Sequence, residues 1–546
     1  MLTTVLTTVL TTVLTTVLTT VQNRVMSTES SALWAADGLS ARYRAVSRVA
    51  WCGAFGLAVA SCAEPTLVLG YDDGTTTVGI TDADGNSSSS GPATVPDESS
   101  SDESGSGPCG PDGASCSSKI DLLFVIDNSG TMGEEQLNLA RNFPLLIEAL
   151  ENLQDGNGNP AGADVNIMVT TTDFGNPECT TSNPGYEAAR GRPIATPCTE
   201  RLARFEGLGD PPLSIAEACT DVCDPDAPAF PTDQFIHFTA TEDNVEGGTP
   251  ANALACIGPQ GIDGCGFEAT LESMAQALDP NTCWNSPETC DDPDFAGVDK
   301  PFLREGATLA IAIITDEADC SVQDFSIMQS ETFMATDPDT MQPALSSALC
   351  WNAGVVCTGV DAGGEYAGCL AANKDAAGGV GVPAGEPSAL QPLSRYAQLF
   401  NNFRAQGKEI IMLGVLGVPE VTARAETAPF EPIEGGVHDL VYRTWREEDV
   451  LPGEAMTGVQ AVDKEFEFGI GPGCTGMGED GTFTGQAIPP VRIREVCESL
   501  NVEDDPTTVA DETKIRCCIE SICDDDFSPA IRCLTDLIQD VFTPVE

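Results

Sequence analysis

The stretch "KIDLLFVIDNSGTMGEEQLNLA", residues 119–140, decides the fold of this chain. Its apolar run "IDLLFVID" predicts a strand that is buried on both faces, which is typical of a parallel sheet. The acidic residues that follow predict the first turn of an amphipathic helix over residues 133–153, because acidic side chains stabilise the start of a helix. Between strand and helix lie Asp127, Ser129 and Thr131, one carboxylate and two hydroxyls.

The same alternation of apolar strands and amphipathic helices continues along the chain. Further strands are predicted over residues 163–174, 307–320, 408–417 and 517–523. Further helices are predicted over residues 266–278, 390–407, 488–500 and 527–542. This alternation indicates an α/β fold. We expect a doubly wound, mostly parallel central sheet with helices on both faces, one hydrophobic core, and long loop insertions attached to it.

Two of the predicted strands end in an aspartate, Asp127 and Asp316. In open α/β sheets, sites form at the carboxyl ends of the strands, so both carboxylates are expected to face one site. Ser129 and Thr131 add two hydroxyl oxygens on a tight turn, in which Gly130 lets the backbone bend. Such a set of oxygens suits a divalent cation, Mg²⁺ first and Ca²⁺ or Mn²⁺ as alternatives.

A purely structural interpretation of these residues also exists. Asp127 can accept hydrogen bonds from the turn that follows it, and Ser129 can cap the helix. That interpretation leaves the spare hydroxyls and the second aspartate unexplained. Glu317 and Asp319 closely follow Asp316, and they either add contacts around a Ca²⁺ ion or belong to a solvated loop.

The motif "DNSGTM" closely resembles the D-x-S-x-S signature of von Willebrand factor type A domains. In that family, the signature combines with a threonine from a second loop and an aspartate from a third to form a metal-ion-dependent adhesion site. The resemblance assigns Asp127 and Ser129 to the signature, with Thr131 in place of its second serine. It assigns Asp316 to the third loop. It implies a bound divalent cation with an open coordination position, which an acidic side chain of a partner fills.

The threonine of the second loop has two candidate positions. "EGGTPANAL", residues 246–254, looks like the family's Gly-Gly-Thr and nominates Thr249. A more regular helix follows "GIDGCGFEATLESM", which would place the equivalent position near residues 262–266, with a water molecule in place of the threonine. The resemblance covers about residues 119–417 and extends toward the C-terminus, with insertions longer than is usual in the family.

The composition points to an oxidising compartment. The chain has 546 residues, a formal net charge of −59 and 22 cysteines. This charge repels nucleic acid, which is excluded as a partner. The cysteines show no C-x-x-C spacing, and His237 and His438 are the two histidines, so disulfides account for the cysteines better than a zinc or haem site does.

Two cysteine-rich insertions are expected, over about residues 175–262 and 321–388. The candidate disulfides near and within the first insertion are Cys109–Cys116, Cys179–Cys198 and Cys219–Cys223. The C-terminal cysteines are expected to be disulfide partners rather than a metal cluster; they are Cys517, Cys518, Cys523 and Cys533.

Residues 1–61 combine a low-complexity repeat, five copies of Leu-Thr-Thr-Val, with a basic and then apolar segment in the order of a signal peptide. The sequence "VASC", which ends at Cys62, resembles the lipobox of bacterial lipoproteins, in which the cysteine is lipidated. Residues 62–118 are rich in Ser, Gly and Asp and predict a disordered tether. We therefore expect an exported protein, lipid-anchored to the outer membrane of a Gram-negative cell and facing either the periplasm or the exterior.

Motifs of catalysis are missing from the sequence, which has no G-x-S-x-G elbow, P-loop or H-E-x-x-H. We therefore expect that this protein is not an enzyme. The leading hypothesis is that residues 119–546 form a domain for divalent-metal-dependent adhesion to a protein or cell-surface matrix that offers an acidic side chain. The alternative is a structural or assembly component of an outer-membrane complex, in which the metal only stabilises the fold.

Overall fold

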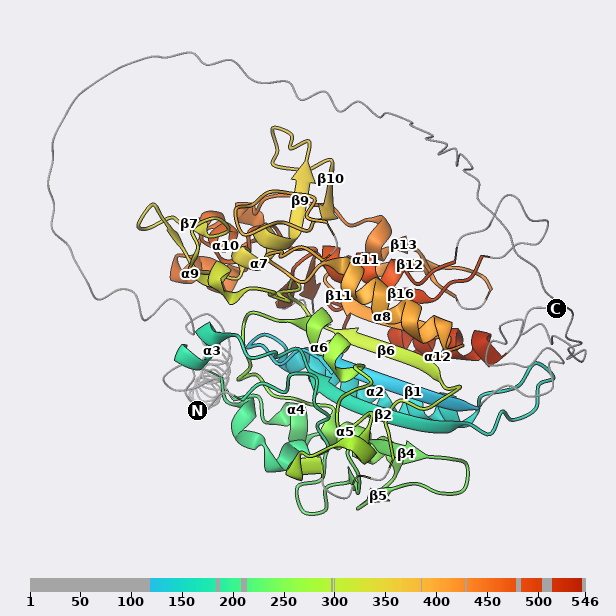
Figure 1. Cartoon of the computed structure of the whole chain (residues 1–546). Coiled ribbons are helices and arrows are strands. Elements are labelled where there is room, and N and C mark those ends of the chain that lie inside the picture. Colours follow the sequence, from blue (N-terminus) through green and yellow to red (C-terminus); the bar gives the residue numbers. More distant parts are fainter. Residues whose placement is uncertain are drawn as a thin grey trace, which may run out of the picture. The chain divides into compact units, whose positions relative to one another are not determined.

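The computed structural model of the chain describes residues 118–182, 187–207, 214–295, 298, 300–383, 385–427, 430–477, 483–502 and 513–542. The expected signal segment, Cys62, the tether and the Cys109–Cys116 pair lie outside these residues. All the described residues fall in the same structural unit (Figure 1). Within them, no helix is both long enough and apolar enough to cross a membrane.

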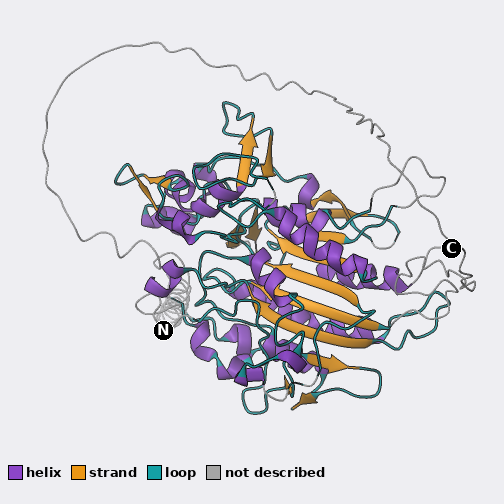
Figure 2. Ribbon diagram, viewed as in Figure 1, coloured by secondary structure: helices purple, strands orange, loops and turns teal. Residues whose placement is uncertain are grey.

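A six-stranded sheet forms the centre of this unit (Figure 2). In spatial order its strands are β16 (Cys517–Ser521), β11 (Ile410–Leu416), β6 (Thr308–Ile314), β1 (Lys119–Ile126), β2 (Asp164–Thr171) and β4 (Ile236–Phe238). Five strands run parallel, and β4 alone among the six pairs antiparallel with its neighbour β2. The prediction of an α/β fold around a mostly parallel sheet is therefore confirmed.

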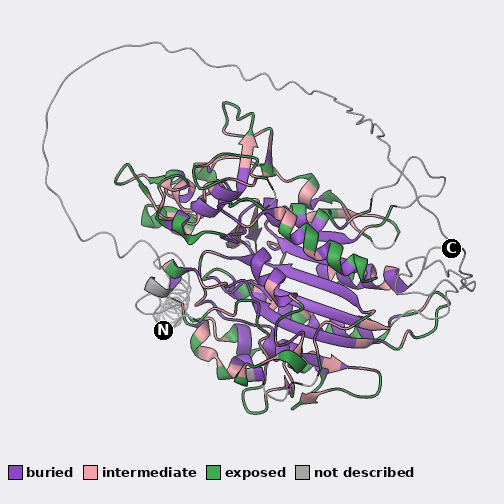
Figure 3. Ribbon diagram, in the orientation of Figure 1, coloured by how far each residue is buried: buried purple, intermediate pink, exposed green. Residues whose placement is uncertain are grey.

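The central strands β6 and β11 are buried along their whole length, because both faces of the sheet are covered (Figure 3). Successive side chains of a strand point to opposite faces, so Phe124 of β1 joins one apolar layer and Val125 joins the other. The first layer contains buried residues of α2 (Gly133–Glu151), α5 (Pro250–Ile257) and α12 (Ser528–Phe542). The second contains those of α6 (Thr270–Ala277), α8 (Leu393–Ala405) and α11 (Val491–Glu498).

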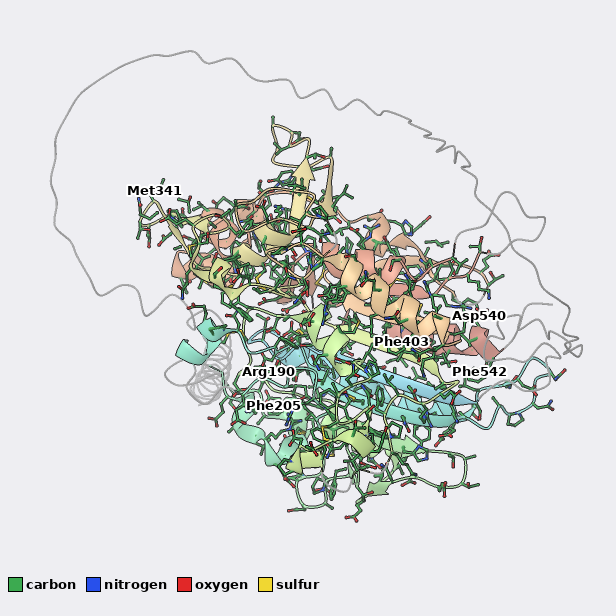
Figure 4. All side chains as sticks on the ribbon, in the orientation of Figure 1. Arg190, Phe205, Met341, Phe403, Asp540 and Phe542 are labelled. Atoms are coloured by element: carbon green, nitrogen blue, oxygen red, sulfur yellow. A yellow bond between two sulfur atoms is a disulfide. The ribbon has the colours of Figure 1, made fainter. Side chains whose placement is uncertain are left out.

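Two aromatic residues labelled in Figure 4 mark these layers: Phe542 of α12 belongs to the first and Phe403 of α8 to the second. Both side chains are nearly inaccessible to solvent. The amphipathic patterns of the sequence therefore indicated five of these helices, each within a few residues of its predicted range, but they missed α5, which lies in a stretch predicted to be a loop insertion.

The segments outside the central sheet and its covering helices carry secondary structure of their own. Their short strands form antiparallel pairs, which are β3 (Phe230–Pro231) with β5 (Val245–Glu246), β7 (Ala335–Asp337) with β8 (Gln342–Ala344), β9 (Val355–Thr358) with β10 (Gly368–Ala371), β12 (Val421–Arg424) with β13 (Pro432–Gly435), and β14 (Cys474–Met477) with β15 (Phe483–Ala487). Their short helices are α3 (Pro177–Ser182), α4 (Glu217–Thr220), α7 (Ala348–Gly354), α9 (Pro452–Thr457) and α10 (Ala461–Phe468).

Two larger apolar clusters of the described residues lie in these segments. One includes Ile327 and Leu349, and the other brings Trp351 and Trp445 together with Ile470. The expectation of plain loops attached to a single core was therefore too simple. These segments bury apolar side chains of their own, which a pattern of short, irregular segments does not reveal.

Nine disulfides join the described cysteines, and the chain is disulfide-rich as predicted. The two pairs proposed within the first insertion were wrong, because Cys179 pairs with Cys265, Cys198 with Cys219, and Cys223 with Cys256. A disulfide requires the two Cα atoms to lie within about 7 Å, and tertiary packing rather than sequence distance decides which cysteines meet that condition. The four C-terminal cysteines all form disulfides, in the pairs Cys474–Cys523, Cys497–Cys517 and Cys518–Cys533.

Candidate metal centre

The ends of β1 and β6, which are neighbours in the sheet, bring Asp127 and Asp316 to one place. Asp127 is fully buried and Asp316 is 7% exposed. The Thr131 hydroxyl donates a hydrogen bond to Oδ2 of Asp316 at 2.5 Å, and Oγ of Ser129 lies 3.5 Å from Oγ1 of Thr131. The structure therefore brings together the four residues that the sequence singled out at these strand ends.

The turn after β1 and the end of β6 hold the Asp127 carboxylate from two sides. Oδ1 accepts the backbone N–H of Ser129 at 2.7 Å, and Oδ2 accepts the hydroxyl of Thr315. The hydrogen bond that the structural interpretation expects from the turn to Asp127 is thus present, but Ser129 does not cap the helix, because the N-cap of α2 is Met132 and no side chain caps it. The hydrogen bonds to Asp127 leave the two hydroxyls of the turn and the Asp316 carboxylate available as oxygen donors to a cation.

Gln136 of α2 fixes this turn against a second loop. Its buried side-chain amide donates to the backbone oxygens of Asp127 and Gly261, each at 2.8 Å. Its amide oxygen accepts the backbone N–H groups of Gln260 and Gly261. Sequence reasoning missed Gln136, because a glutamine in the first turns of an acidic helix does not reveal whether it faces solvent or the core.

Thr249 is placed differently from the other predicted ligands. It is the exposed N-cap of α5, where its hydroxyl accepts the backbone N–H of Asn252 at 3.3 Å. The loop that contacts the "DNSGTM" turn is the later one, since the N–H of Gly264 donates to the backbone oxygen of Asn128 at 2.9 Å. The hydroxyl of Thr249 hydrogen-bonds within the cap of its own helix, and the later of the two candidate positions is the one beside the turn.

That later loop carries a carboxylate, Glu268, which sequence reasoning missed. Glu268 has no exposed surface, and its Oε2 accepts the hydroxyl of Thr172, which follows β2. Its backbone oxygen accepts the N–H of Cys320, which follows β6, at 2.7 Å. Because β1 lies between β2 and β6, these two bonds hold Glu268 above the end of β1, where Asp127 stands.

Burial and mutual repulsion raise the pKa values of these carboxyl groups. Desolvation, then the charge of Asp316, raises the pKa of Asp127 to about 8, and desolvation raises the pKa of Asp316 to about 6. Desolvation and neighbouring carboxylates also raise the pKa values of Glu135, Glu268 and Glu317 well above their usual range.

The five carboxyl groups at the ends of β1 and β6 are named the acidic cluster below; they are those of Asp127, Glu135, Glu268, Asp316 and Glu317. Among the described residues, no basic side chain forms an ion pair with any of them. Buried carboxylates without cations are costly. This arrangement is expected where a metal cation supplies the missing positive charge.

Several oxygens of the acidic cluster are buried without a hydrogen-bond partner among the described residues: Oδ1 of Asp316, Oε1 of Glu268 and Oε2 of Glu135. Hydroxyl and carboxylate oxygens are the ligands that Mg²⁺ and Ca²⁺ prefer. The residues present therefore fit a divalent cation, which would be held by Asp127, Ser129, Thr131 and Asp316 and would attract anionic groups.

A small pocket beside Asp316 gives access to the cluster. Glu135 and Asp316 line one side, and residues of the β14–β15 hairpin and of the loop after β16 line the other: Gly476, Gly485, Gln486, Ala487, Ile522 and Cys523. The Cys474–Cys523 disulfide ties the hairpin to that loop. The N–H of Ile488 donates to the backbone oxygen of Asp316 at 2.7 Å, which fixes the hairpin against the site.

A second group of metal-ligand types, Cys518, Glu520 and Cys533, is not a metal site. The two cysteines form a disulfide, and Glu520 pairs with Arg424 through both carboxylate oxygens. This outcome agrees with the expectation that the C-terminal cysteines are disulfide partners.

No protein-family model, curated protein or solved structure matches this chain. The function must therefore be argued from the site itself.

Proposed function

We propose that the domain binds a divalent cation at the ends of β1 and β6 and uses it to capture an acidic group of a protein or surface-matrix partner. Asp127, Ser129, Thr131 and Asp316 would hold the cation. Mg²⁺ is the first choice, with Ca²⁺ and Mn²⁺ as alternatives. Binding rather than catalysis is the proposed role.

The observation that carries this proposal is the meeting of a hydroxyl-bearing turn with a buried carboxylate from another strand end, at the Thr131–Asp316 contact. A hydrogen bond alone needs one oxygen of Asp316, yet Oδ1 of the same group is buried and has no partner in the part of the chain that the structure describes. A cation between the two strand ends would use this oxygen, and it would offset the repulsion between Asp127 and Asp316.

The strand order supports a doubly wound fold of the von Willebrand factor type A kind. The order β16-β11-β6-β1-β2-β4 has β1 at the point where successive connections change direction, and ligands bind at such points in open α/β sheets. Helices from both apolar layers flank the sheet. We propose membership of this fold type on these grounds and on the "DNSGTM" motif.

The pocket beside Asp316 is the proposed entry for the partner. A partner carboxylate approaching there would meet backbone and side chains of β14 and β15. The hairpin would then decide which partners fit, because its glycines, Gly476 and Gly485, leave space where a larger side chain would fill the pocket.

The same hairpin favours the alternative function. Since β14 and β15 lie against the site and are tied down by a disulfide, the cation would then serve only to hold β1, β6 and the hairpin together. Such a protein would be a structural or assembly component rather than an adhesin.

A divalent-dependent capture experiment separates the two functions. The purified protein is immobilised, and capture of cell-surface protein is compared in Mg²⁺, in Ca²⁺ and in EDTA, and again with a soluble acidic peptide as competitor. Adhesion predicts capture that EDTA abolishes, that Asp127→Ala abolishes, and that the acidic peptide blocks. The exposed Glu134→Gln change is the matched control and keeps capture. If EDTA leaves capture intact while Asp127→Ala lowers only the melting temperature, the structural function stands instead.

Export and lipid anchoring at Cys62 form a separate part of the proposal. The nine disulfides support the export part of this proposal, because disulfides persist in oxidising compartments. Metabolic labelling with a radioactive fatty acid tests it: the native chain should carry label in the membrane fraction, and Cys62→Ser should not.

A further inference from the structure

We propose that Asp173 is a positioning residue of the cation site: its buried carboxylate holds the turn after β1 against the loop before α6 and thereby sets the affinity of the turn for the cation. This inference rests on the proposed function, because it concerns the affinity of the proposed cation site. Asp173 lies outside the "DNSGTM" turn, and it is not one of the residues that would hold the cation.

The pairing of β1 with β2 brings Asp173 to the turn. The two strands run parallel, and Ile126 at the end of β1 pairs with Thr171 at the end of β2. Asn128 and Asp173 each follow two residues later, so they stand at the same edge of the sheet. Asp173 is 2% exposed, and its Oδ2 accepts the side-chain N–H of Asn128 at 3.0 Å. This bond therefore joins the turn after β1 to the end of the neighbouring strand.

The other oxygen of the same carboxylate holds the loop before α6. Oδ1 of Asp173 accepts the backbone N–H of Cys265 at 3.1 Å. The N–H of the preceding residue, Gly264, donates to the backbone oxygen of Asn128 at 2.9 Å, so three hydrogen bonds close a ring through Asp173, the turn and the loop. A Cβ atom at Gly264 would lie 2.4 Å from that oxygen, which shows how closely the two segments approach. The Cys179–Cys265 disulfide anchors the loop further.

The ring acts on the residues that would hold the cation. Asn128 stands between Asp127 and Ser129 in the chain, so its position fixes the backbone that carries both of these side chains. Both oxygens of Asp173 accept N–H groups of the protein, as expected of a residue that orients the site without touching the cation. Groups that orient metal ligands in this way are worth about 10–100-fold in metal affinity.

Mn²⁺ titration of the purified full chain tests the proposal. After dialysis against a chelator, Mn²⁺ is added, and the free ion is measured by its electron paramagnetic resonance signal. We expect Asp173→Ala to bind Mn²⁺ at least about tenfold more weakly than the native chain. Asp173→Asn should recover most of that loss, because the introduced amide can accept the N–H of Cys265 and donate to the Asn128 amide once that amide turns over.

Asn128→Ala removes the same hydrogen bond from the other side. It should also weaken Mn²⁺ binding, and the double variant should bind no more weakly than Asp173→Ala alone, because the two partners of one bond do not contribute independently. Asp121→Asn is the matched control. The carboxylate of Asp121 is fully buried on β1 as well, but it accepts hydrogen bonds from Arg304 near the opposite end of the strand. This variant should lose stability and keep the native Mn²⁺ affinity.

Hydrogen exchange in EDTA supplies a measurement that does not depend on the cation. Asp173→Ala should speed exchange in the turn, residues 127–131, and in the loop, residues 262–266, because each loses a hydrogen bond to the other or to Asp173. Asp121→Asn should leave exchange in both segments unchanged. A thermal scan in the same solution shows whether each variant keeps the native fold.

The possible outcomes separate this inference from the proposed function. Native Mn²⁺ affinity in a folded Asp173→Ala chain overturns the inference and leaves the function. Additive losses in Asp173→Ala and Asn128→Ala overturn it as well, and so does an equal loss in Asp121→Asn, because affinity would then merely follow stability. If Asp173→Ala does not fold, Asn128→Ala takes its place, and native affinity there overturns the inference. A native chain that binds no Mn²⁺ overturns the proposed function and this inference together.

Discussion

The hydroxyl of Thr131 and the carboxylate of Asp316 are hydrogen-bonded at 2.5 Å, although 185 positions separate them in the sequence. The bond joins the turn after β1 to the end of β6. This bond brings a second carboxylate to the turn that carries Asp127. It can form only when β1 and β6 pair in register.

The Asp127→Asn change should lower the stability of the protein when the cation is present, and it should not lower it when the cation is removed. A cation that binds only the folded protein stabilises it by about 2.7 kcal/mol at one hundred times its Kd. We therefore expect the native chain to lose stability in EDTA and Asp127→Asn to be indifferent to EDTA. In EDTA at pH 8 the variant should be at least as stable as the native chain, because the repulsion of Asp316 is removed.

Urea unfolding in Ca²⁺ and in EDTA measures this difference. A variant that is less stable than the native chain by the same amount in both solutions would show that Asp127 acts only through the hydrogen bonds of its turn.

The stability of the cation-free protein should fall as the pH rises from about 4 to about 8. The pKa of Asp127 is raised to about 8 and that of Asp316 to about 6, from an ordinary value of 3.8. Within this window the folded protein therefore binds more protons than the unfolded chain, so its stability is greatest below the ordinary pKa and declines through the folded values. Saturating Ca²⁺ should suppress the decline, because the ion stabilises the ionised carboxylates.

Melting temperatures in EDTA and in Ca²⁺, measured between pH 5 and pH 8, test this dependence. The difference between the two solutions should widen with pH; a constant difference would count against cation binding by these aspartates.

Thr249→Ala should lower stability without affecting cation binding. The Thr249 side chain caps α5, and the loss of such a cap costs about 1 kcal/mol. Mn²⁺ titration of this variant should give the native affinity. A large loss of affinity would instead show that Thr249 is a ligand, as the first of the two sequence positions proposed.

Gln136→Leu should be strongly destabilising despite its similar size. The glutamine satisfies two backbone oxygens and two backbone N–H groups, and each buried group left without a partner costs about 1–3 kcal/mol. We expect a loss of at least about 3 kcal/mol in urea unfolding, with weaker Mn²⁺ binding because the Asp127 turn loses its support. The exposed Glu134→Leu change on the same helix is the control and should have little effect on either measurement.

Removing the Cys474–Cys523 disulfide by a double serine change should release the β14–β15 hairpin. The bridge spans 49 positions, and the chain-entropy relation assigns such a loop roughly 4 kcal/mol of stabilisation. Hydrogen exchange should increase mainly at β14 and β15, and capture of large acidic partners should improve if the hairpin limits access. Removal of the Cys283–Cys290 bridge, which spans 7 positions, is the control, with an expected loss of about 2.5 kcal/mol and no change at the hairpin.

The sequence by itself determined the five parallel strands of the central sheet and most of the helices that cover it, but not β4 or α5. An apolar run such as residues 122–126 is stable only where both faces of its strand are covered. An aspartate directly after such a run lies at the carboxyl end of the strand, where sites form in open α/β sheets. For this reason the residue pattern alone is enough to pair Asp127 with Asp316, together with the hydroxyls of Ser129 and Thr131.

Only the tertiary structure decided what surrounds those four residues. The placement of Glu268 depends on simultaneous bonds to the ends of β2 and β6, and the partner of Cys179 is Cys265 rather than Cys198. No local pattern encodes either relationship, because each follows from how elements distant in the sequence pack together. The spacing of apolar residues in the sequence shows which side of a strand or helix is buried. The neighbours of a buried side chain depend on how all the elements pack together.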